Sequence, residues 1–252
     1  EKINIYAQNG DYEVAKYSIG RDAFEKADNN QLSPTELLLS TEIDSPSEDP
    51  LYTSASFIPS INFPEFDWSM SPALRHQIGG PEGFYLGQLW WRTDASIKFA
   101  RNFALNSSFG INIYDTFDGF ANPSQSTIPR VRSDIQSYLA EGKNNIEKMN
   151  FEYYSNPAKD IYARFDFGLL EAMFGGFGGE VLYRPFDKDY AIGLTAHKVK
   201  QRGYNQLFSF RDYSTVTGHL ALYYDFPYAV RSQLLMGKYL AGDKGVTLDL
   251  SR

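Results

Sequence analysis

The chain has 252 residues, no cysteine, a formal net charge of −7 and an aromatic content of 16%. The lack of cysteine excludes disulfides, thiolate metal sites and cysteine nucleophiles, and the absence of a basic block leaves no electrostatic footprint for nucleic acid. No run of about 18 apolar residues occurs, which excludes a transmembrane helix.

The first 48 residues are predicted to form a small α+β module that ends in a linker. Two alternating runs flank Asn9-Gly10, the typical signal of a β-hairpin. A short helix is expected over residues 21–27, and Ser33-Pro34-Thr35-Glu36 supplies the N-cap and first-turn proline of a second one. The acidic stretch over residues 40–50 is rich in serine and proline, which indicates a linker.

From residue 49 to residue 252, apolar and polar side chains alternate in runs of about ten residues. In the clearest run, over residues 161–169, the apolar side chains share one face, and Arg164 and Asp166 lie on the other. Successive side chains on a strand point to opposite faces, so this strand has one apolar and one charged face. Further strands are predicted over residues 66–71, 89–99, 105–113, 146–154, 180–183, 190–199, 214–224, 230–239 and 246–250.

The predicted connections alternate between short and long, which places all short turns at one end of the sheet. Turns are expected at residues 101–102, 156–159, 186–189 and 226–228, and longer loops at residues 115–145, 170–179 and 200–213. This asymmetry is typical of bacterial outer-membrane barrels. The mean hydropathy of −0.40 does not oppose a barrel, because polar lumen residues offset apolar lipid-facing ones. We therefore predict an all-β chain, an antiparallel transmembrane β-barrel; a soluble β-sandwich also fits the alternation.

Charged residues on the polar faces are candidates to line a lumen or its mouth and to contact a glycan. They are Arg92, Asp94, Lys98, Arg164, Asp166, His197 and Arg211. Sugars are bound by hydrogen-bonding groups and flat aromatic faces, so such a lumen would guide a glycan. The alternative is that these charges pair across neighbouring strands and fill the barrel. Arg130, Arg132 and Asp134 lie in the longest loop and are candidates to plug the lumen or meet a partner.

Metal and catalytic chemistry have little support in the sequence. The three histidines, His76, His197 and His219, are far apart and in no ligand spacing, so neither a metal nor another cofactor is predicted. Glu171 and Glu180 flank a glycine-rich segment and could form the carboxylate pair of a glycosidase. The alternative is a glycine-rich loop with glutamates at strand ends, available to a partner. We predict a non-enzymatic protein, with a glycan-processing enzyme using Glu171 or Glu180 as a weaker alternative.

Several longer motifs resemble the YjbH family of Gram-negative exopolysaccharide-production outer-membrane proteins. They lie at residues 78–85 (IGGPEGFY), 128–135 (IPRVRSDI), 170–185 (LEAMFGGFGGEVLYRP), 210–219 (FRDYSTVTGH) and 237–252 (GKYLAGDKGVTLDLSR). The resemblance runs from about Trp68 to the end of the chain and is looser before it. It implies an outer-membrane β-barrel that works with a lipoprotein and small periplasmic proteins in polysaccharide export or surface assembly, without enzymatic activity.

The resemblance also sets the expected surroundings of the chain. We expect membrane lipid around the strands, a polysaccharide as the molecule handled, a periplasmic N-terminal module, and lipoprotein or periplasmic partners from an exopolysaccharide operon. Family members continue past the position of Arg252, and a last strand ending there would leave an open edge in lipid. Further polypeptide or a second chain is therefore expected to close the barrel. The competing function is a soluble periplasmic carbohydrate-binding β-sandwich.

Overall fold

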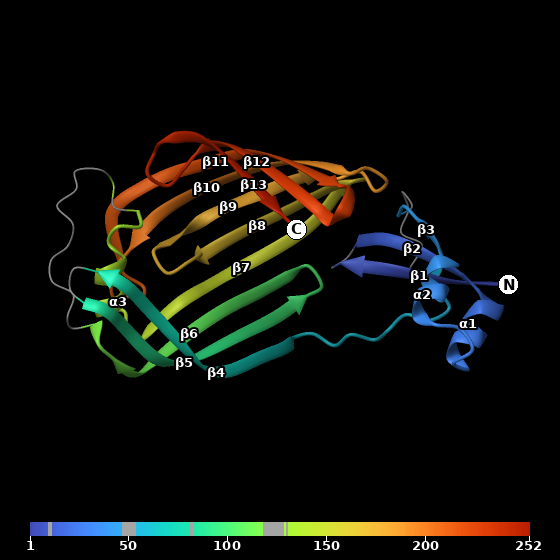
Figure 1. Cartoon of the computed structure of the whole chain (residues 1–252), viewed down its shortest axis with the longest axis horizontal. Helices are drawn as coiled ribbons and strands as arrows, with labels where there is room; N and C mark the ends of the chain where they lie inside the picture. The colour runs from blue at the N-terminus through green and yellow to red at the C-terminus, as the bar shows by residue number, and fades with distance from the viewer. Residues whose placement is uncertain (10–11, 47–53, 81–82, 118–128, 130) are drawn as a thin grey trace.

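The computed structural model describes residues 1–9, 12–46, 54–80, 83–117, 129 and 131–252. Two antiparallel sheets make up the fold (Figure 1): a three-stranded sheet in the order β1-β2-β3, and a ten-stranded sheet in which β4 to β13 pair in sequence order. The prediction of a mostly antiparallel β chain is thus confirmed.

No helix within the described ranges has both the length and the apolar character needed to cross a membrane.

The N-terminal sheet carries two short helices. Its elements are β1 (Lys2–Asn9), β2 (Tyr12–Gly20), α1 (Arg21–Asp28), α2 (Pro34–Leu39) and β3 (Glu42–Asp44). The predicted cap is present, because the Ser33 hydroxyl accepts from the Glu36 N–H at 3.3 Å and the Glu36 carboxylate accepts from the Ser33 N–H at 2.9 Å. The linker prediction is wrong at Glu42–Asp44, which pairs with β2 as a third strand. Gly10 of the predicted hairpin lies outside the described residues.

The large sheet contains every strand predicted after residue 49. Its elements are β4 (Glu65–Gly80), β5 (Gly83–Ala100), β6 (Phe103–Asp115), α3 (Ile135–Glu141), β7 (Asn145–Ala158), β8 (Ile161–Leu169), β9 (Phe174–Tyr183), β10 (Tyr190–Arg202), β11 (Phe210–Phe226), β12 (Val230–Lys238) and β13 (Lys244–Ser251). All neighbouring pairs are antiparallel.

The connections fall at two different ends of this sheet, as predicted, but two of the expected long loops are wrong. Residues 174–179 belong to β9, and β10 extends to Arg202, so the loops shrink to residues 170–173 and 203–209. The glycine-rich segment forms a strand because its glycines allow close approach of the neighbouring strand. A Cβ at Gly178 would meet the His197 ring at 2.2 Å.

The short-turn end of the large sheet lies next to the N-terminal sheet (Figure 1). Arg101, in the turn between β5 and β6, donates to the side chain of Gln8 at 2.9 Å. The rings of Tyr12 and Tyr162 lie 5.4 Å apart. The opposite end, called here the loop end, carries α3 and the loops at residues 170–173, 203–209 and 239–243.

The ten strands curve into an open trough (Figure 1). The strand order ends at β4 on one side and β13 on the other, and within the described residues these two edges do not pair with each other. The sheet is therefore not closed into a barrel in this structure.

The two faces of the trough have a distribution of polarity opposite to that of a soluble sheet. On β8, Phe165 and Phe167 are 46% and 42% exposed, whereas Asp166 between them is only 5% exposed. We call the side that carries these phenylalanines the outer face, and the side that carries Asp166 the inner face. Exposed outer-face residues include Phe66, Trp68, Met70, Trp91, Ile111, Phe165, Phe167, Phe177, Val181, Ile192, Leu194, Val216, Leu220, Leu222, Val246, Leu248 and Leu250.

The outer face is not covered by a second sheet in the described part of the chain. Leu89, Phe165 and Leu220 all retain more than a third of their exposure, and the only other sheet described is the three-stranded one at the short-turn end. A β-sandwich would bury these side chains between two sheets. The sandwich alternative is therefore not what the structure contains.

Candidate functional site: the polar inner face

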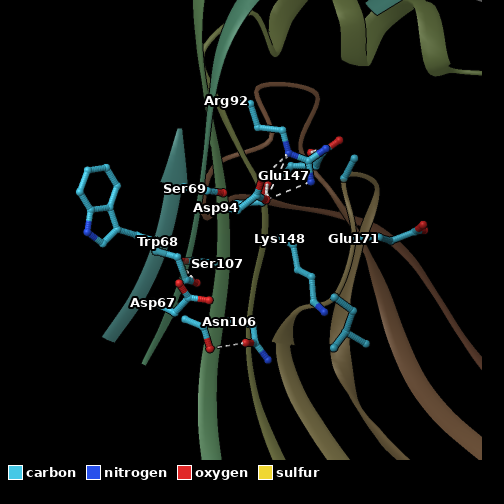
Figure 2. Close-up of a pocket in the computed structure, with 15 residues that line it drawn as sticks. Asp67, Trp68, Ser69, Arg92, Asp94, Asn106, Ser107, Glu147, Lys148 and Glu171 are labelled. Atoms are coloured by element: carbon cyan, nitrogen blue, oxygen red, sulfur yellow. Dashed lines mark hydrogen bonds and ion pairs between the residues drawn. The ribbon is translucent and has the colours of Figure 1, made fainter. Parts of the chain in front are cut away.

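Charged residues from three strands and a serine from a fourth meet on the inner face near β4 to β7. The guanidinium of Arg92 donates to the Asp94 carboxylate at 3.0 Å and lies 3.5 Å from Glu147. Arg75 from β4 reaches the same glutamate at 3.3 Å, and the Ser108 hydroxyl on β6 donates to Asp94 at 2.7 Å. Figure 2 shows Arg92, Asp94 and Glu147 converging. We call these five residues the first cluster.

Glu147 enters this cluster through an irregularity in the ladder. Lys148 pairs with Ser108 and Ile146 pairs with Phe109, so the β6–β7 register shifts at Glu147. An extra residue in one strand re-aims the side chains beside it. Plain alternation puts Glu147 on the same side as Met149, facing outward, and this is why sequence reasoning missed it.

A second cluster joins β8, β9 and β10. Arg164 donates to Glu180 at 3.3 Å and lies 3.9 Å from Asp166. His197 on β10 reaches the Asp166 carboxylate at 3.1 Å. β8, which carries Asp166, and β10, which carries His197, lie on opposite sides of β9. On β9, Gly178 pairs with both Asp166 and His197. Without a side chain at this position, the imidazole can cross β9 to the carboxylate.

The remaining two predicted inner-face residues lie away from both clusters. Lys98 pairs with Glu65 at 2.9 Å, toward the short-turn end. Arg211 lies over the ring of Tyr204 at 4.0 Å, at the loop end. The structure therefore brings together five of the seven predicted residues, in two groups, and the ion pairs across strands match the alternative that charges pair to fill the interior.

A cavity of about 540 Å³ opens on the inner face beside the first cluster. Its polar lining includes Asp67, Ser69, Arg92, Asp94, Asn106, Glu147, Lys148 and Glu171 (Figure 2). Trp68 points away from the cavity in the same view. The cavity presents carboxylates, amides and hydroxyls to whatever enters it, which is a suitable set for hydrogen bonding to sugar hydroxyls.

A smaller cavity of about 300 Å³ lies on the inner face toward the short-turn end. It is lined by residues of β9 to β13, among them Glu180, Tyr223, Gln233 and Asp249. Tyr223 adds an aromatic ring to polar groups, the combination that sugar binding requires. Within the described residues, no group of histidines and carboxylates could hold a metal ion.

The loop end of the trough is covered from inside by α3 and its neighbours. Tyr138 on α3 packs with Met173, Phe174 and Val199 in a fully buried apolar cluster. Burial raises the pKa of the Tyr138 phenol to about 12, so the hydroxyl keeps its proton and donates to the Arg202 carbonyl at 2.6 Å.

Arg202 holds this cover in place. Its side chain is 0% exposed and donates to backbone carbonyls of Ile146, Glu147, Glu171, Gln206 and Leu207 at 2.5–3.2 Å. A buried charge is tolerated when it is well hydrogen-bonded; here both terminal nitrogens of the guanidinium donate, whereas Nε has no partner among the described residues. One guanidinium thus ties together the start of β7 and the loops before β9 and after β10.

Two of the three loop residues predicted to plug the lumen or meet a partner lie in this cover. Asp134 accepts from the Tyr204 hydroxyl at 2.6 Å, and Arg132 pairs with Glu171 at 2.7 Å. Arg130 lies outside the described residues.

Glu171 and Glu180 do not meet. Glu171 lies in the loop before β9 and pairs with Arg132, whereas Glu180 lies within β9 and pairs with Arg164. At about 3.3 Å per residue, the rise from Phe174 to Glu180 alone is about 20 Å. Glycosidases hold their two carboxyl groups about 5–10 Å apart, so these two residues do not form such a pair.

Sequence reasoning also missed Arg202 and Trp90. Trp90 was not among the predicted lining residues, but it is 2% exposed on the inner side, with the Arg75 guanidinium 3.7 Å above its ring. Its alternation with Arg92 and Asp94 was the signal that could have placed it. No sequence pattern marked Arg202, because its partners are backbone carbonyls, which every residue has.

The chain matches known proteins in two ways. A family model described as YjbH, exopolysaccharide biosynthesis protein YbjH, matches residues 1–252. The chain is 38% identical over 202 residues to "Uncharacterized lipoprotein YjbH" of Escherichia coli (strain K12), covering 76% of this chain and 28% of that protein. The chain thus spans less than a third of the relative's length. No solved structure matches it.

Replacing Arg202 by Met is expected to loosen the cover while the sheet persists. Each hydrogen bond from a charged donor contributes about 1.5–3 kcal/mol, and five are lost. Limited proteolysis should cut the loops around residues 131–144 and 203–209 at least about tenfold faster, because local opening becomes cheaper. Arg231→Met, which removes an exposed guanidinium at the start of β12, far from the cover, is the control. Equal cleavage of both variants contradicts the role given to Arg202.

Proposed function

The chain belongs to the YjbH family of exopolysaccharide biosynthesis proteins, and from this premise we propose that it is an outer-membrane component of exopolysaccharide export or surface assembly. Its strands form part of a β-barrel wall. The polar inner face guides a glycan and performs no chemistry on it.

The observation that carries this proposal is the reversed polarity of the sheet. Soluble proteins rarely expose a continuous apolar patch above a few hundred Å², yet here exposed apolar side chains run from Phe66 on β4 to Leu250 on β13. Full burial of one Leu or Phe side chain contributes about 1.5–3 kcal/mol. Hydrocarbon against this face removes a cost that water imposes on every strand.

The height of the apolar band suits a bilayer. On β10, Ile192, Leu194 and Ala196 point outward between Tyr190 and Lys198. The stretch is nine residues long when both of these boundary residues are counted. A tilted strand needs about 9–11 residues to cross the hydrocarbon core. Tyr183, Tyr190 and Tyr224 are exposed together at the short-turn side of the band, where aromatic side chains favour the lipid–water boundary.

The two open edges of the sheet, β4 and β13, require further strands in a membrane. Unpaired backbone groups of β4 and β13 would face hydrocarbon, which lipid does not tolerate. We therefore infer that strands outside the described residues, or a second chain, pair with these edges and complete the barrel.

The proposed orientation follows from the two ends. Short turns face the periplasm in outer-membrane barrels and the longest loops face outward. The longest connection of the sheet, between β6 and β7, carries α3 and lies at the loop end, so the N-terminal sheet at the opposite end is assigned to the periplasm. The E. coli relative is named a lipoprotein, which supports a place in the cell envelope. Lipoprotein and periplasmic partners would meet the N-terminal unit, where Leu38 and Leu39 are 58% and 82% exposed.

The non-enzymatic part of the proposal rests on the paired state of the inner charges. Arg92, Arg164, Asp166 and Glu180 each lie in ion pairs, and the glutamates considered for hydrolysis lie apart. Such a face offers hydrogen bonds along its length without a poised acid and base. A glycan can contact it and move on.

Leu194→Arg tests whether lipid touches the outer face. Leu194 is 60% exposed, so the change costs almost nothing in water, but about 2–4 kcal/mol at the middle of a bilayer. We expect a loss of unfolding free energy of that size for protein reconstituted in vesicles, measured by urea titration. Phe57→Arg is the control, because Phe57 is 78% exposed outside the strands. Stability unchanged by Leu194→Arg would remove the membrane proposal.

Ser69→Trp tests the glycan path. Ser69 lines the 540 Å³ cavity, and an indole there would fill much of the space without removing an ion pair. We expect surface polysaccharide to fall severalfold while the protein stays in the membrane fraction. Met70→Trp, the next residue on the opposite face, is the matched control. Normal surface polysaccharide with Ser69→Trp shows that no glycan passes this cavity.

A further inference from the structure

Four lysines lie along one boundary of the apolar band on the outer face. They are Lys198 and Lys200 on β10, Lys238 on β12 and Lys244 on β13, and we call them the lysine row. Every second side chain on a strand points to the same face. Lys198 and Lys200 therefore point outward, as Ile192 and Leu194 do. Lys238 likewise lies on the same face of β12 as Met236, and Lys244 on the same face of β13 as Val246, the residue that pairs with Met236.

The ladder register brings the lysine row together. Lys198 pairs with Val216 on β11, and Lys238 pairs with Gly218, two residues further along the same strand. Lys238 and Lys244 are directly opposite each other. Neighbouring strands lie about 4.8 Å apart, and β10 and β12 flank β11. Flexible lysine side chains from these two strands can therefore reach one headgroup above β11.

The row is not neutralised by carboxylates. Ion pairs involving described residues occur at Lys2, Lys16, Lys26, Lys98, Lys143, Lys148 and Lys188, and at none of the four. Asp212 is exposed on the same face of β11, two residues before Ser214, the partner of Lys200, and makes no ion pair within the described chain. Like charges directly opposite on paired strands are destabilising. On the inner face, by contrast, Arg92, Lys98 and Arg164 each pair with a carboxylate.

A shallow groove on the outer face lies next to the row. Its volume is about 440 Å³, and its lining includes Leu194, Ala196, Val216, Leu220 and Lys238. The groove is mainly apolar and has a lysine at its margin. An acyl chain fits such a groove, and the charge of its headgroup would then lie beside the lysine row.

We propose that the lysine row binds the phosphate of an anionic membrane lipid, with an acyl chain of that lipid in the adjoining groove. The inference rests on the proposed membrane location of the outer face. Charge complementarity selects the occupant, since a cationic row at the edge of an apolar band attracts anionic headgroups. The lysines stand at the loop end, so the lipid belongs to the leaflet on that side.

The test compares lipid preference in three variants. K198Q/K200Q/K238Q/K244Q removes the row, the four corresponding Lys→Arg changes keep its charge, and K2Q/K16Q/K26Q/K159Q removes the same charge far from it. Each protein, purified in uncharged detergent, is titrated with dansyl-labelled phosphatidylglycerol or phosphatidylcholine, and transfer from tryptophan is recorded. At roughly fivefold per lysine near a surface, we expect the wild type to prefer phosphatidylglycerol by about tenfold or more.

The row variant should lose this preference, while the arginine and distant variants keep it. An equal preference in the row variant overturns the proposal, and so does full displacement of phosphatidylglycerol by 10 mM inorganic phosphate, roughly the excess that saturates a free-phosphate site. Extraction from membranes tests the proposed membrane location separately from lipid binding by the lysine row. Wild type that is soluble without detergent contradicts the proposed function itself. Wild type that needs detergent but has no lipid preference contradicts only the binding of lipid by the lysine row.

Discussion

The structure depends on an unequal distribution of hydrophobic surface: the side chains that gain most from leaving water are the ones that the fold leaves outside. Phe165 and Phe167 are exposed while Asp166 between them is buried. A single sheet cannot bury both faces, and this one encloses its polar face. An apolar medium or partner that covers the outer face would therefore stabilise this fold.

Placing charges inside the trough imposes a second constraint, which pairing satisfies. Arg92, Arg164 and His197 each reach a carboxylate on the same or a nearby strand. Arg202 uses backbone carbonyls instead, because the loops there turn their carbonyl groups toward it. Because its charges are paired, the interior offers hydrogen-bonding groups but little unpaired charge. Such a surface suits the sliding of a hydroxyl-rich polymer.

Much of this arrangement could be predicted from the sequence, because strands and their faces obey a period of two. The run at residues 161–169 defined both faces of β8, and Ser33 with Glu36 defined the start of α2. The predictions that failed depend on contacts between distant segments. Residues 174–179 form a strand because their glycines let the neighbouring strands approach closely. Glu147 faces inward because of a register shift, and Arg202 is held by carbonyls that no sequence pattern marks. The Glu42–Asp44 strand exists only because β2 offers it an edge.

The central claim is that adjacent residues on one strand face hydrocarbon and water. The chain has no cysteine, so single nitroxide labels can be attached at Leu194→Cys and Thr195→Cys on β10 in protein reconstituted in lipid vesicles. Collision with oxygen, which concentrates in hydrocarbon, is compared with collision with a water-soluble nickel chelate. The account predicts that oxygen but little nickel reaches the label at residue 194, and that nickel reaches the label at residue 195. Equal access of nickel to both labels would contradict it.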